Sequence, residues 1–331
     1  MVAQAPRMTR TFWDHAMNAS DVRSPVTAAA VLLVGCSSAA VPPATAAPTV
    51  ASGAPPPAAP RAPSGAVSPS PRGSLDRCPA ARPLAALPVL ARPPLRPDDL
   101  LVAPGGGLWV SDPDGGHLAR IDAGGRAVTR IDDPRGPEGM VLLGDGRMVL
   151  SEQRTNRLVT LRPPDPAVTE LAALPPAGGR LGIDGIALDA ARRRVLVPDS
   201  AAGALRALPL DGGPMVTLAT RLGRAVGAVA APDGSVYVAA EASPGLLRVD
   251  PAGRVTAVGR LGDLDDVVLA GGLLYVTALG GHSVLAVDPA GGGDRTLATG
   301  LGEPQGLAVL PDGRLAAADS PSRVIVAIDG C

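Results

Sequence analysis

Short apolar runs alternate with turns rich in glycine and aspartate from about residue 78 to the last residue of the chain. A typical unit begins with one apolar run and passes through a Gly-rich or Pro-Asp-Gly turn into a second run such as "VYVAA". A third and a fourth run follow. Runs of this length that are rich in β-branched residues predict antiparallel strands. Helical spacing is absent from this region, so the pattern predicts an all-β domain.

The four-run unit recurs along the chain. Six copies begin at an apolar run whose second residue is 39 to 46 positions from that of the next copy. This period is typical of the four-stranded blades of a β-propeller. Residues 78–331 are therefore predicted to form a six-bladed β-propeller. The second residues of the copies are Asp98, Glu138, Asp184, Val226, Asp265 and Gln305.

The last copy ends after its third strand, at "VIVAID". A run that fits the missing fourth strand, Leu84–Pro93, lies before the first copy. We expect this N-terminal strand to complete the last blade, because a propeller closed in this way has no exposed sheet edge at the junction.

An apolar run, Pro25–Gly35, follows the basic residue Arg23. The run is too short to span a bilayer comfortably, but it has the length of the apolar core of a secretory signal. It leads into "LVGC", with Cys36 last, which resembles the lipobox of bacterial lipoproteins. The resemblance implies that residues 1–36 are a lipoprotein signal segment, that Cys36 is lipidated, and that the protein is exported and anchored to the bacterial cell envelope. The alternative is a buried apolar segment with an ordinary cysteine.

Residues 37–77 are rich in Pro, Ala and Ser and have no periodic apolar pattern. Such a segment cannot bury enough apolar surface to offset the entropy lost on ordering. We therefore expect a disordered linker, with the lipid anchor as the only contact with the membrane.

Two further cysteines, Cys78 and Cys331, flank the predicted propeller. If Cys36 anchors the chain outside the cytoplasm, disulfide bonds persist there and these two residues remain to pair. Their bridge would close a loop of about 250 residues and contribute roughly 5 kcal/mol in the chain-entropy model. We expect both cysteines on neighbouring strands of the composite last blade; the alternative is two unpaired thiols.

Charge and aromatic content exclude one class of partner. The chain has 30 basic and 31 acidic residues, and no basic cluster is typical of a surface that follows phosphates. Aromatic residues make up 2% of the sequence, which leaves few platforms for stacking bases or sugars. We expect no nucleic-acid partner, and a monomer that binds either a small-molecule ligand or an envelope protein.

The second residues of the copies open the innermost strands, so we expect them to form a ring at one mouth of the central channel. Four of them are carboxylates, which repel one another and raise some of their pKa values unless a cation neutralises them. Oxygen donors of this kind suit Ca²⁺ or another hard divalent cation. If the register differs by one residue, Asp99 and Asp266 replace their neighbours; alternatively, the ring is merely hydrated. The predicted ligands are Asp98, Glu138, Asp184, Asp265 and Gln305.

The rhythm "GLAVLPDGRLAAADS…RVIVAID" resembles the superfamily of NHL-repeat and gluconolactonase/regucalcin-like six-bladed propellers. The resemblance spans about Leu84 to Cys331. Regucalcin-like lactonases hold a divalent ion in this ring, and the resemblance places Asp98 and Asp265 at two ligand positions. Val226 stands where a ligand Asn is expected, and the Glu-Gly-Pro signature of the first blade is missing.

Two functions follow from this resemblance. In the first, the protein is a cation-dependent hydrolase of a lactone or a related small ester. The ion would polarise the carbonyl group and lower the pKa of bound water, with Asp265 or Asp184 as the general base. In the second, the protein is a non-catalytic NHL-like propeller that binds a protein or a small ligand at the cell envelope.

Four other side chains are candidates for a site on the same face. His117 and His282 follow Gly-Gly pairs in loops before third strands, where a lyase or a phosphatase could use them as acid and base. The alternative is a repeated turn position, with Asn156 and Ser322 as its equivalents in other blades. Glu152 and Glu241 end second strands and are predicted to rim a ligand pocket.

Overall fold

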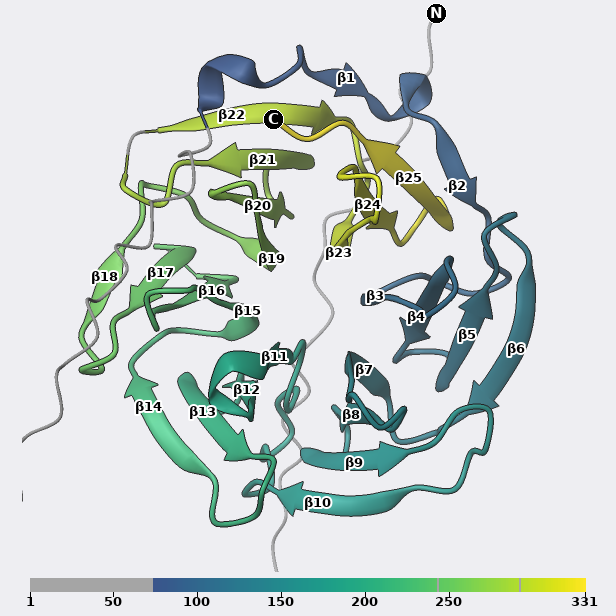
Figure 1. Cartoon of the computed structure of the whole chain (residues 1–331), viewed down its shortest axis with the longest axis vertical. Helices are drawn as coiled ribbons and strands as arrows, with labels where there is room; N and C mark the ends of the chain where they lie inside the picture. The colour runs from purple at the N-terminus through teal and green to yellow at the C-terminus, as the bar shows by residue number, and fades with distance from the viewer. Residues whose placement is uncertain (1–73, 243, 292) are drawn as a thin grey trace, which may run out of the picture. The chain divides into compact units, whose positions relative to one another are not determined.

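The computed structural model describes residues 74–331 except residues 243 and 292. In this part of the chain, 25 strands form six sheets arranged around a central axis (Figure 1). The predicted all-β, six-bladed propeller is confirmed. The predicted signal segment, the lipidation site Cys36 and most of the predicted linker lie outside the described residues.

The blades follow one another along the chain. Blades one to three consist of β3 (Leu100–Val102), β4 (Leu108–Asp112), β5 (His117–Ile121) and β6 (Ala127–Asp132); of β7 (Pro137–Leu142), β8 (Met148–Glu152), β9 (Arg157–Leu161) and β10 (Thr169–Ala173); and of β11 (Ala187–Asp189), β12 (Arg194–Asp199), β13 (Ala204–Pro209) and β14 (Val216–Thr220).

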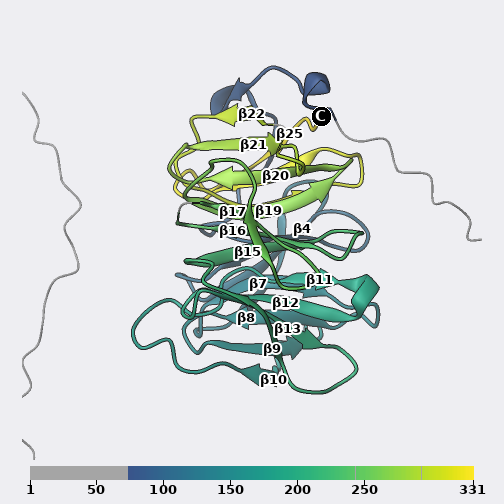
Figure 2. The same ribbon diagram turned by 90° about the vertical axis from the view of Figure 1, so that its left-hand side faces the viewer.

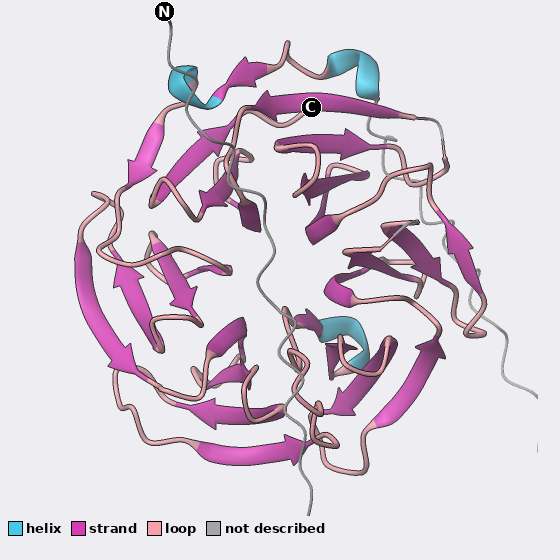
Figure 3. Cartoon of the chain, turned by 180° about the vertical axis from the view of Figure 1, so that it is seen from behind, coloured by secondary structure: helices cyan, strands magenta, loops and turns pink. Residues whose placement is uncertain are grey.

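Blades four to six consist of β15 (Ala225–Ala230), β16 (Val236–Ala240), β17 (Leu246–Val249) and β18 (Val255–Ala257); of β19 (Leu264–Ala270), β20 (Leu273–Ala278), β21 (Ser283–Val287) and β22 (Asp294–Thr299); and of β23 (Pro304–Val309), β24 (Leu315–Asp319), β25 (Val324–Ile328) and β2 (Val89–Ala91). Strands dominate the ring (Figure 3). The described helices are the short 3-10 turns η1 (Leu75–Arg77), η2 (Leu84–Ala86) and η3 (Ala190–Arg192). Among the described residues, none of the helices has the length and hydropathy needed to cross a membrane.

The hydrophobic core lies between neighbouring blades. Side chains alternate along a strand, so each blade presents one set to the blade before it and another to the blade after it. On β8, Met148 and Leu150 pack in the cluster that includes Trp109 of blade one, whereas Val149 packs in the cluster that includes Val195 of blade three. Full burial of one such side chain contributes about 1.5–3 kcal/mol. This two-sided burial explains why the middle strands are apolar at consecutive positions.

The N-terminal segment closes the ring, as predicted. β2 pairs antiparallel with β25, with Val89 opposite Val326, and forms the outermost strand of blade six. An unexpected second contact precedes it: β1 (Arg82–Pro83) pairs parallel with β22 of blade five. The segment between η1 and β2 therefore joins two neighbouring blades from outside.

A disulfide bond joins Cys78 to Cys331. The prediction that both residues lie on strands was wrong, because Cys78 caps η1 and Cys331 follows β25. The backbone N–H of Cys331 donates a hydrogen bond of 3.0 Å to the hydroxyl oxygen of Tyr275 in blade five. Two views place the C-terminus beside β22 and β25 (Figures 1 and 2). The end of the predicted linker, Leu75–Arg77, is the helical turn η1 and belongs to this closure.

Candidate functional site at the channel mouth

The innermost strands begin at one mouth of the channel, and glycine lets them approach one another there. In four blades a glycine follows the predicted ring residue; they are Gly139, Gly185, Gly227 and Gly306. A Cβ atom on any of them would lie 2.4–2.9 Å from the backbone of the next blade. Asp99 and Asp266 take this position in blades one and five. The carboxylate of Asp266 accepts hydrogen bonds of 2.7 Å from the N–H groups of Val267 and Leu307, so it joins blade five to blade six.

Asp98 and Glu138 meet at this mouth and hydrogen bond to each other. Burial raises the pKa of Asp98 to about 6, and burial together with the charges of Asp98 and Asp184 raises the pKa of Glu138 well above its usual range. Two carboxyl groups in contact share one proton more readily than both of them ionise. The second carboxylate oxygen of Glu138, Oε2, is buried and has no hydrogen-bond partner among the described residues.

Asp184 is held by an arginine that the sequence did not indicate. Nη2 of Arg224 lies 2.7 Å from Oδ2 of Asp184, and its Nη1 contacts the carboxylate of Glu241. Burial raises the pKa of Asp184 to about 7, although the charge of Arg224 opposes the rise. Arg224 lies in blade four, two residues before Val226, so this blade contributes a guanidinium to the mouth. The four carboxylates predicted for the ring were the available signal, because buried like charges call for a balancing cation.

Asp265 is held by Gln305. With the Gln305 amide oriented so that its nitrogen faces the carboxylate, that nitrogen donates to both oxygens of Asp265 at 2.9 and 3.0 Å. Burial and the negative charges of Asp184 and Asp98 raise the pKa of Asp265 well above its usual range. The pKa of Asp99 is also raised well above its usual range, by burial first and then by the charges of Asp266 and Asp98.

The structure thus brings Asp98, Glu138, Asp184 and Asp265 close enough for their charges to interact. Val226 packs instead in the hydrophobic cluster between blades four and five. Within the described residues, no group of three or more His, Cys, Asp or Glu is arranged to hold a metal ion. In the structure two of the ring carboxylates have protein partners: Asp265 is paired with Gln305, and Asp184 is paired with Arg224.

The two histidines differ in position. His117 is the first residue of β5 and is buried, with its Nε2 3.5 Å from Oδ2 of Asp112. His282 precedes β21, is exposed, and its Nδ1 lies 2.9 Å from the backbone oxygen of Gly302. The two histidines therefore occupy different positions of the repeat: His117 is the first residue of its strand, and His282 is the residue before its strand.

The turn position occupied by His282 has positive φ in other blades too. His282 has φ of 48°, Asn156 has 53° and Arg323 has 50°. The predicted equivalence with Asn156 is therefore correct, but Arg323, not Ser322, is the equivalent in blade six. This geometry makes His282 a turn residue of the repeat.

Glu152 and Glu241 also differ. Glu152 is fully buried, and its carboxylate contacts Arg157 and lies 3.0 Å from Nε of Arg135. The prediction that Glu152 rims a pocket was wrong, because these two arginines hold it inside blade two. Glu241 is about one quarter exposed and meets Arg224 at the mouth, where it belongs to the site.

Comparison with known proteins supports the fold. The chain matches no protein-family model, and a comparison with curated protein sequences finds no match. Similar solved structures include a putative gluconolactonase (TM-score 0.61, 17% identity, 74% of this chain and 92% of that chain covered). They also include the PQQ-bound aldose sugar dehydrogenase from Streptomyces coelicolor (TM-score 0.64, 16% identity, 73% and 96% covered). A chain of the nidogen/laminin complex is a third (TM-score 0.53, 16% identity, 67% and 92% covered). At these identities the likeness concerns the propeller fold, which is shared by proteins of different functions.

Proposed function

We propose that this chain is an exported, lipid-anchored binding propeller whose channel mouth takes a small ligand that carries a protonated amine. The observation that carries the proposal is the pairing of the ring carboxylates. Asp184 and Asp265 are paired with Arg224 and Gln305, whereas Asp98 and Glu138 hydrogen bond to each other. Arg96 acts on Asp98 through its charge, and Oε2 of Glu138 has no hydrogen-bond partner among the described residues. The carboxyl pair of Asp98 and Glu138 is therefore the part of the ring that can still accept a cation.

An ammonium group suits this pair better than a divalent ion. It carries one charge and donates three hydrogen bonds, so it can bind the free Oε2 of Glu138 and the carboxylate of Asp98 without a cage of oxygen ligands. A bound positive charge favours the ionised form of a neighbouring carboxyl group. Ligand binding would thus release the proton shared by Asp98 and Glu138 to the buffer.

Calorimetric titration of the full chain with n-butylamine, and with n-butanol as a neutral match, tests this proposal. We expect saturable binding of the amine alone, with a heat that depends on the ionisation enthalpy of the buffer because a proton is released. Glu138→Gln should weaken binding about tenfold and abolish the buffer dependence. Glu170→Gln, a change on the exposed strand β10, should leave both unchanged. Equal binding of amine and alcohol, or no binding at all, would overturn the proposal.

A divalent-cation-dependent hydrolase of a lactone or related ester is the second candidate function. Its support is the concentration of four carboxylates at one mouth, together with a solved gluconolactonase-like propeller of the same fold. Because the ring residues do not form a ready set of ligands, Ca²⁺ would have to displace Arg224 or Gln305. Titration with Ca²⁺, Mg²⁺ and Zn²⁺ separates the candidates: saturable binding that is lost in both Asp184→Ala and Asp265→Ala, together with lactone hydrolysis, favours the hydrolase.

Export and anchoring rest on the lipobox-like ending at Cys36. Replacing this residue, Cys36→Ser, removes the acceptor of the lipid. We expect the variant to leave the membrane fraction, and unchanged retention in that fraction would reject the anchor.

A further inference from the structure

A cavity of about 520 Å³ lies between blades four and five. The strand ends that line it are opposite to the ends that form the channel mouth. It is lined at the strand ends that carry the Gly271–Gly272 turn and the turn that begins at Asp288, whereas the ring residue Asp265 lies at the opposite end of β19. The outermost strand of blade four, β18, has three residues, compared with six in β22 of blade five. A short outer strand covers less of the neighbouring blade and leaves this space open.

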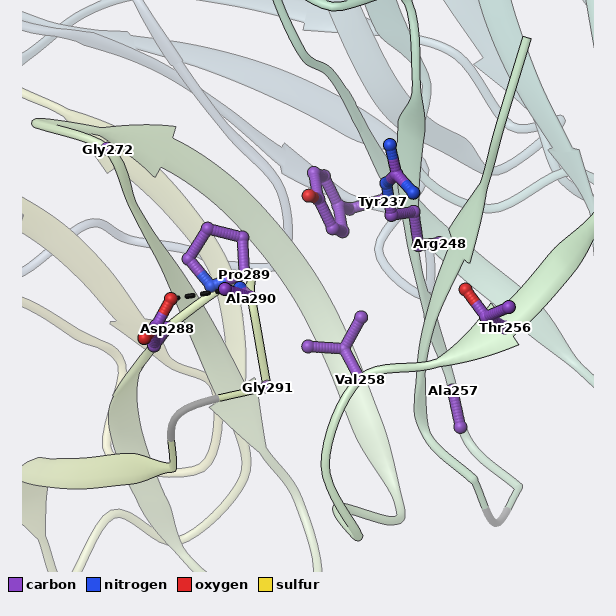
Figure 4. Close-up of a pocket in the computed structure, with 10 residues that line it drawn as sticks. All are labelled: Tyr237, Arg248, Thr256, Ala257, Val258, Gly272, Asp288, Pro289, Ala290 and Gly291. Carbon is purple, nitrogen blue, oxygen red and sulfur yellow. Dashed lines mark hydrogen bonds between the residues drawn. The ribbon is translucent and has the colours of Figure 1, made fainter. Parts of the chain in front are cut away.

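Three polar side chains form a row along one wall of the cavity. Tyr237 on β16 is the cross-strand partner of Arg248 on β17, and Arg248 is the partner of Thr256 on β18. Cross-strand partners point to the same face of a sheet. A hydroxyl, a guanidinium and a second hydroxyl therefore stand side by side, and Figure 4 shows Tyr237 and Arg248 together above the cavity, with Thr256 on the next strand.

The other walls are mainly apolar. Val258 points into the space, and Pro289 and Ala290 lie across from the polar row (Figure 4). The carboxylate of Asp288 also borders the cavity and accepts the N–H of Ala290 at 2.9 Å within its own turn. Among the described residues that line the cavity, Arg248 is the positive charge that a carboxylate can meet.

We propose that this cavity binds a small organic carboxylate, whose charged group meets Arg248 between the hydroxyl groups of Tyr237 and Thr256 and whose apolar body lies against Val258 and Pro289. A guanidinium presents several N–H donors in one plane and matches the two oxygens of a carboxylate. The volume is in the range of small-molecule sites, which combine apolar walls with a few polar groups. This site is separate from the channel mouth and does not depend on the function proposed for it.

An existing ion pair limits the affinity of this site. Nη2 of Arg248 lies 2.9 Å from Oδ2 of Asp233, and both side chains are partly exposed. The carboxylate of Asp233 also accepts the N–H of Ser235 at 2.9 Å, a bond that an asparagine oxygen can replace. Asp233→Asn should therefore keep the turn and release the guanidinium for a ligand.

Binding of benzoate to the full chain, measured by calorimetry with benzamide as the neutral match, tests the proposal. We expect benzoate to bind about tenfold more tightly than benzamide, since a charge-assisted hydrogen bond is lost with the amide. Arg248→Gln should remove this preference, Tyr237→Phe should weaken benzoate binding, and Asp233→Asn should strengthen it about two- to fivefold. No binding of benzoate, or no preference over benzamide in the unmodified chain, would overturn the proposal.

Blade six supplies a matched control. Arg314 and Asp312 form the same kind of turn ion pair, at 2.7 Å and with similar exposure, but do not line the cavity. Arg314→Gln should leave benzoate binding unchanged. Equal effects of Arg314→Gln and Arg248→Gln would show a general effect of charge and contradict the site.

Discussion

Nη2 of Arg224 lies 2.7 Å from Oδ2 of Asp184, and this contact sets the charge balance of the channel mouth. Asp184 is surrounded by the negative charges of Asp98 and Glu241, and burial raises its pKa to about 7. Without the arginine, the ionised form of Asp184 would be buried among carboxylates alone. The mouth is thus acidic in composition but contains its own cation.

Replacing this arginine, Arg224→Gln, should destabilise the fold in a pH-dependent way. At pH 8 Asp184 is largely ionised and would lose its partner, at a cost of about 2 kcal/mol in the free energy of unfolding. At pH 5 Asp184 is protonated, so the loss should be smaller. Urea denaturation at both pH values measures the difference, with the exposed pair variant Arg126→Gln as control. An equal loss at both pH values would contradict the assigned role of Asp184.

The raised carboxyl pKa values predict how stability depends on pH. Asp98 has a pKa of about 6 in the folded chain and 3.8 as its ordinary value, so the folded state retains its proton over a range in which the unfolded state has lost it. The free energy of unfolding should therefore fall as the pH rises from about 4 to 6. Asp98→Asn removes this group. Between pH 4 and pH 6, the free energy of unfolding of the variant should rise by roughly 1–3 kcal/mol relative to that of the unmodified chain. Urea denaturation of both proteins measures this difference. A difference in the free energy of unfolding that is the same at pH 4 and pH 7 would refute the raised pKa of Asp98.

Close approach of the innermost strands predicts different effects of an alanine substitution at two glycines of blade two. A Cβ atom on Gly139 would lie 2.4 Å from the backbone nitrogen of Ile186, so Gly139→Ala should lower the free energy of unfolding by about 1–3 kcal/mol. Gly144 has no atom of the described residues within 4 Å of such a Cβ, so Gly144→Ala should have little effect. Thermal unfolding of the two variants measures the contrast, and similar melting temperatures would argue against the packing at the axis.

The disulfide predicts a large effect of removing both cysteines. Cys78 and Cys331 are separated by 253 positions, and opening so long a loop costs roughly 3–5 kcal/mol in the chain-entropy model. The double variant Cys78→Ser, Cys331→Ser should unfold at lower denaturant concentration than the unmodified chain. A reductant should shift the unmodified chain in the same direction and leave the double variant where it is.

The fold was predictable because the same pattern of apolar runs and turns recurs in each copy of the repeat. Six copies with turn residues at matching places fix the number of blades, and the missing strand after "VIVAID" predicted β2. The parallel pairing of β1 with β22 had no such signal, since two residues carry no period. The positions of the two cysteines outside the strands were missed for the same reason.

The sequence predicted where the ring residues lie, but not which side chains pair with them. The register of the copies located Asp98, Glu138, Asp184 and Asp265 at one mouth. Which side chain neutralises which depends on contacts between blades, and Arg224 precedes its blade's ring position by two residues. Val226, at the corresponding position of blade four, packs in the hydrophobic cluster between blades four and five.

The closure between blades five and six has a mechanical consequence. A pull on residue 74 passes through η1 to Cys78, and the disulfide transfers it to Cys331 at the other end of the chain. The load then reaches β25 and, through the hydrogen bond from Cys331 to Tyr275, blade five as well. A load on residue 74 is therefore shared by both ends of the propeller, and β2 does not bear it alone.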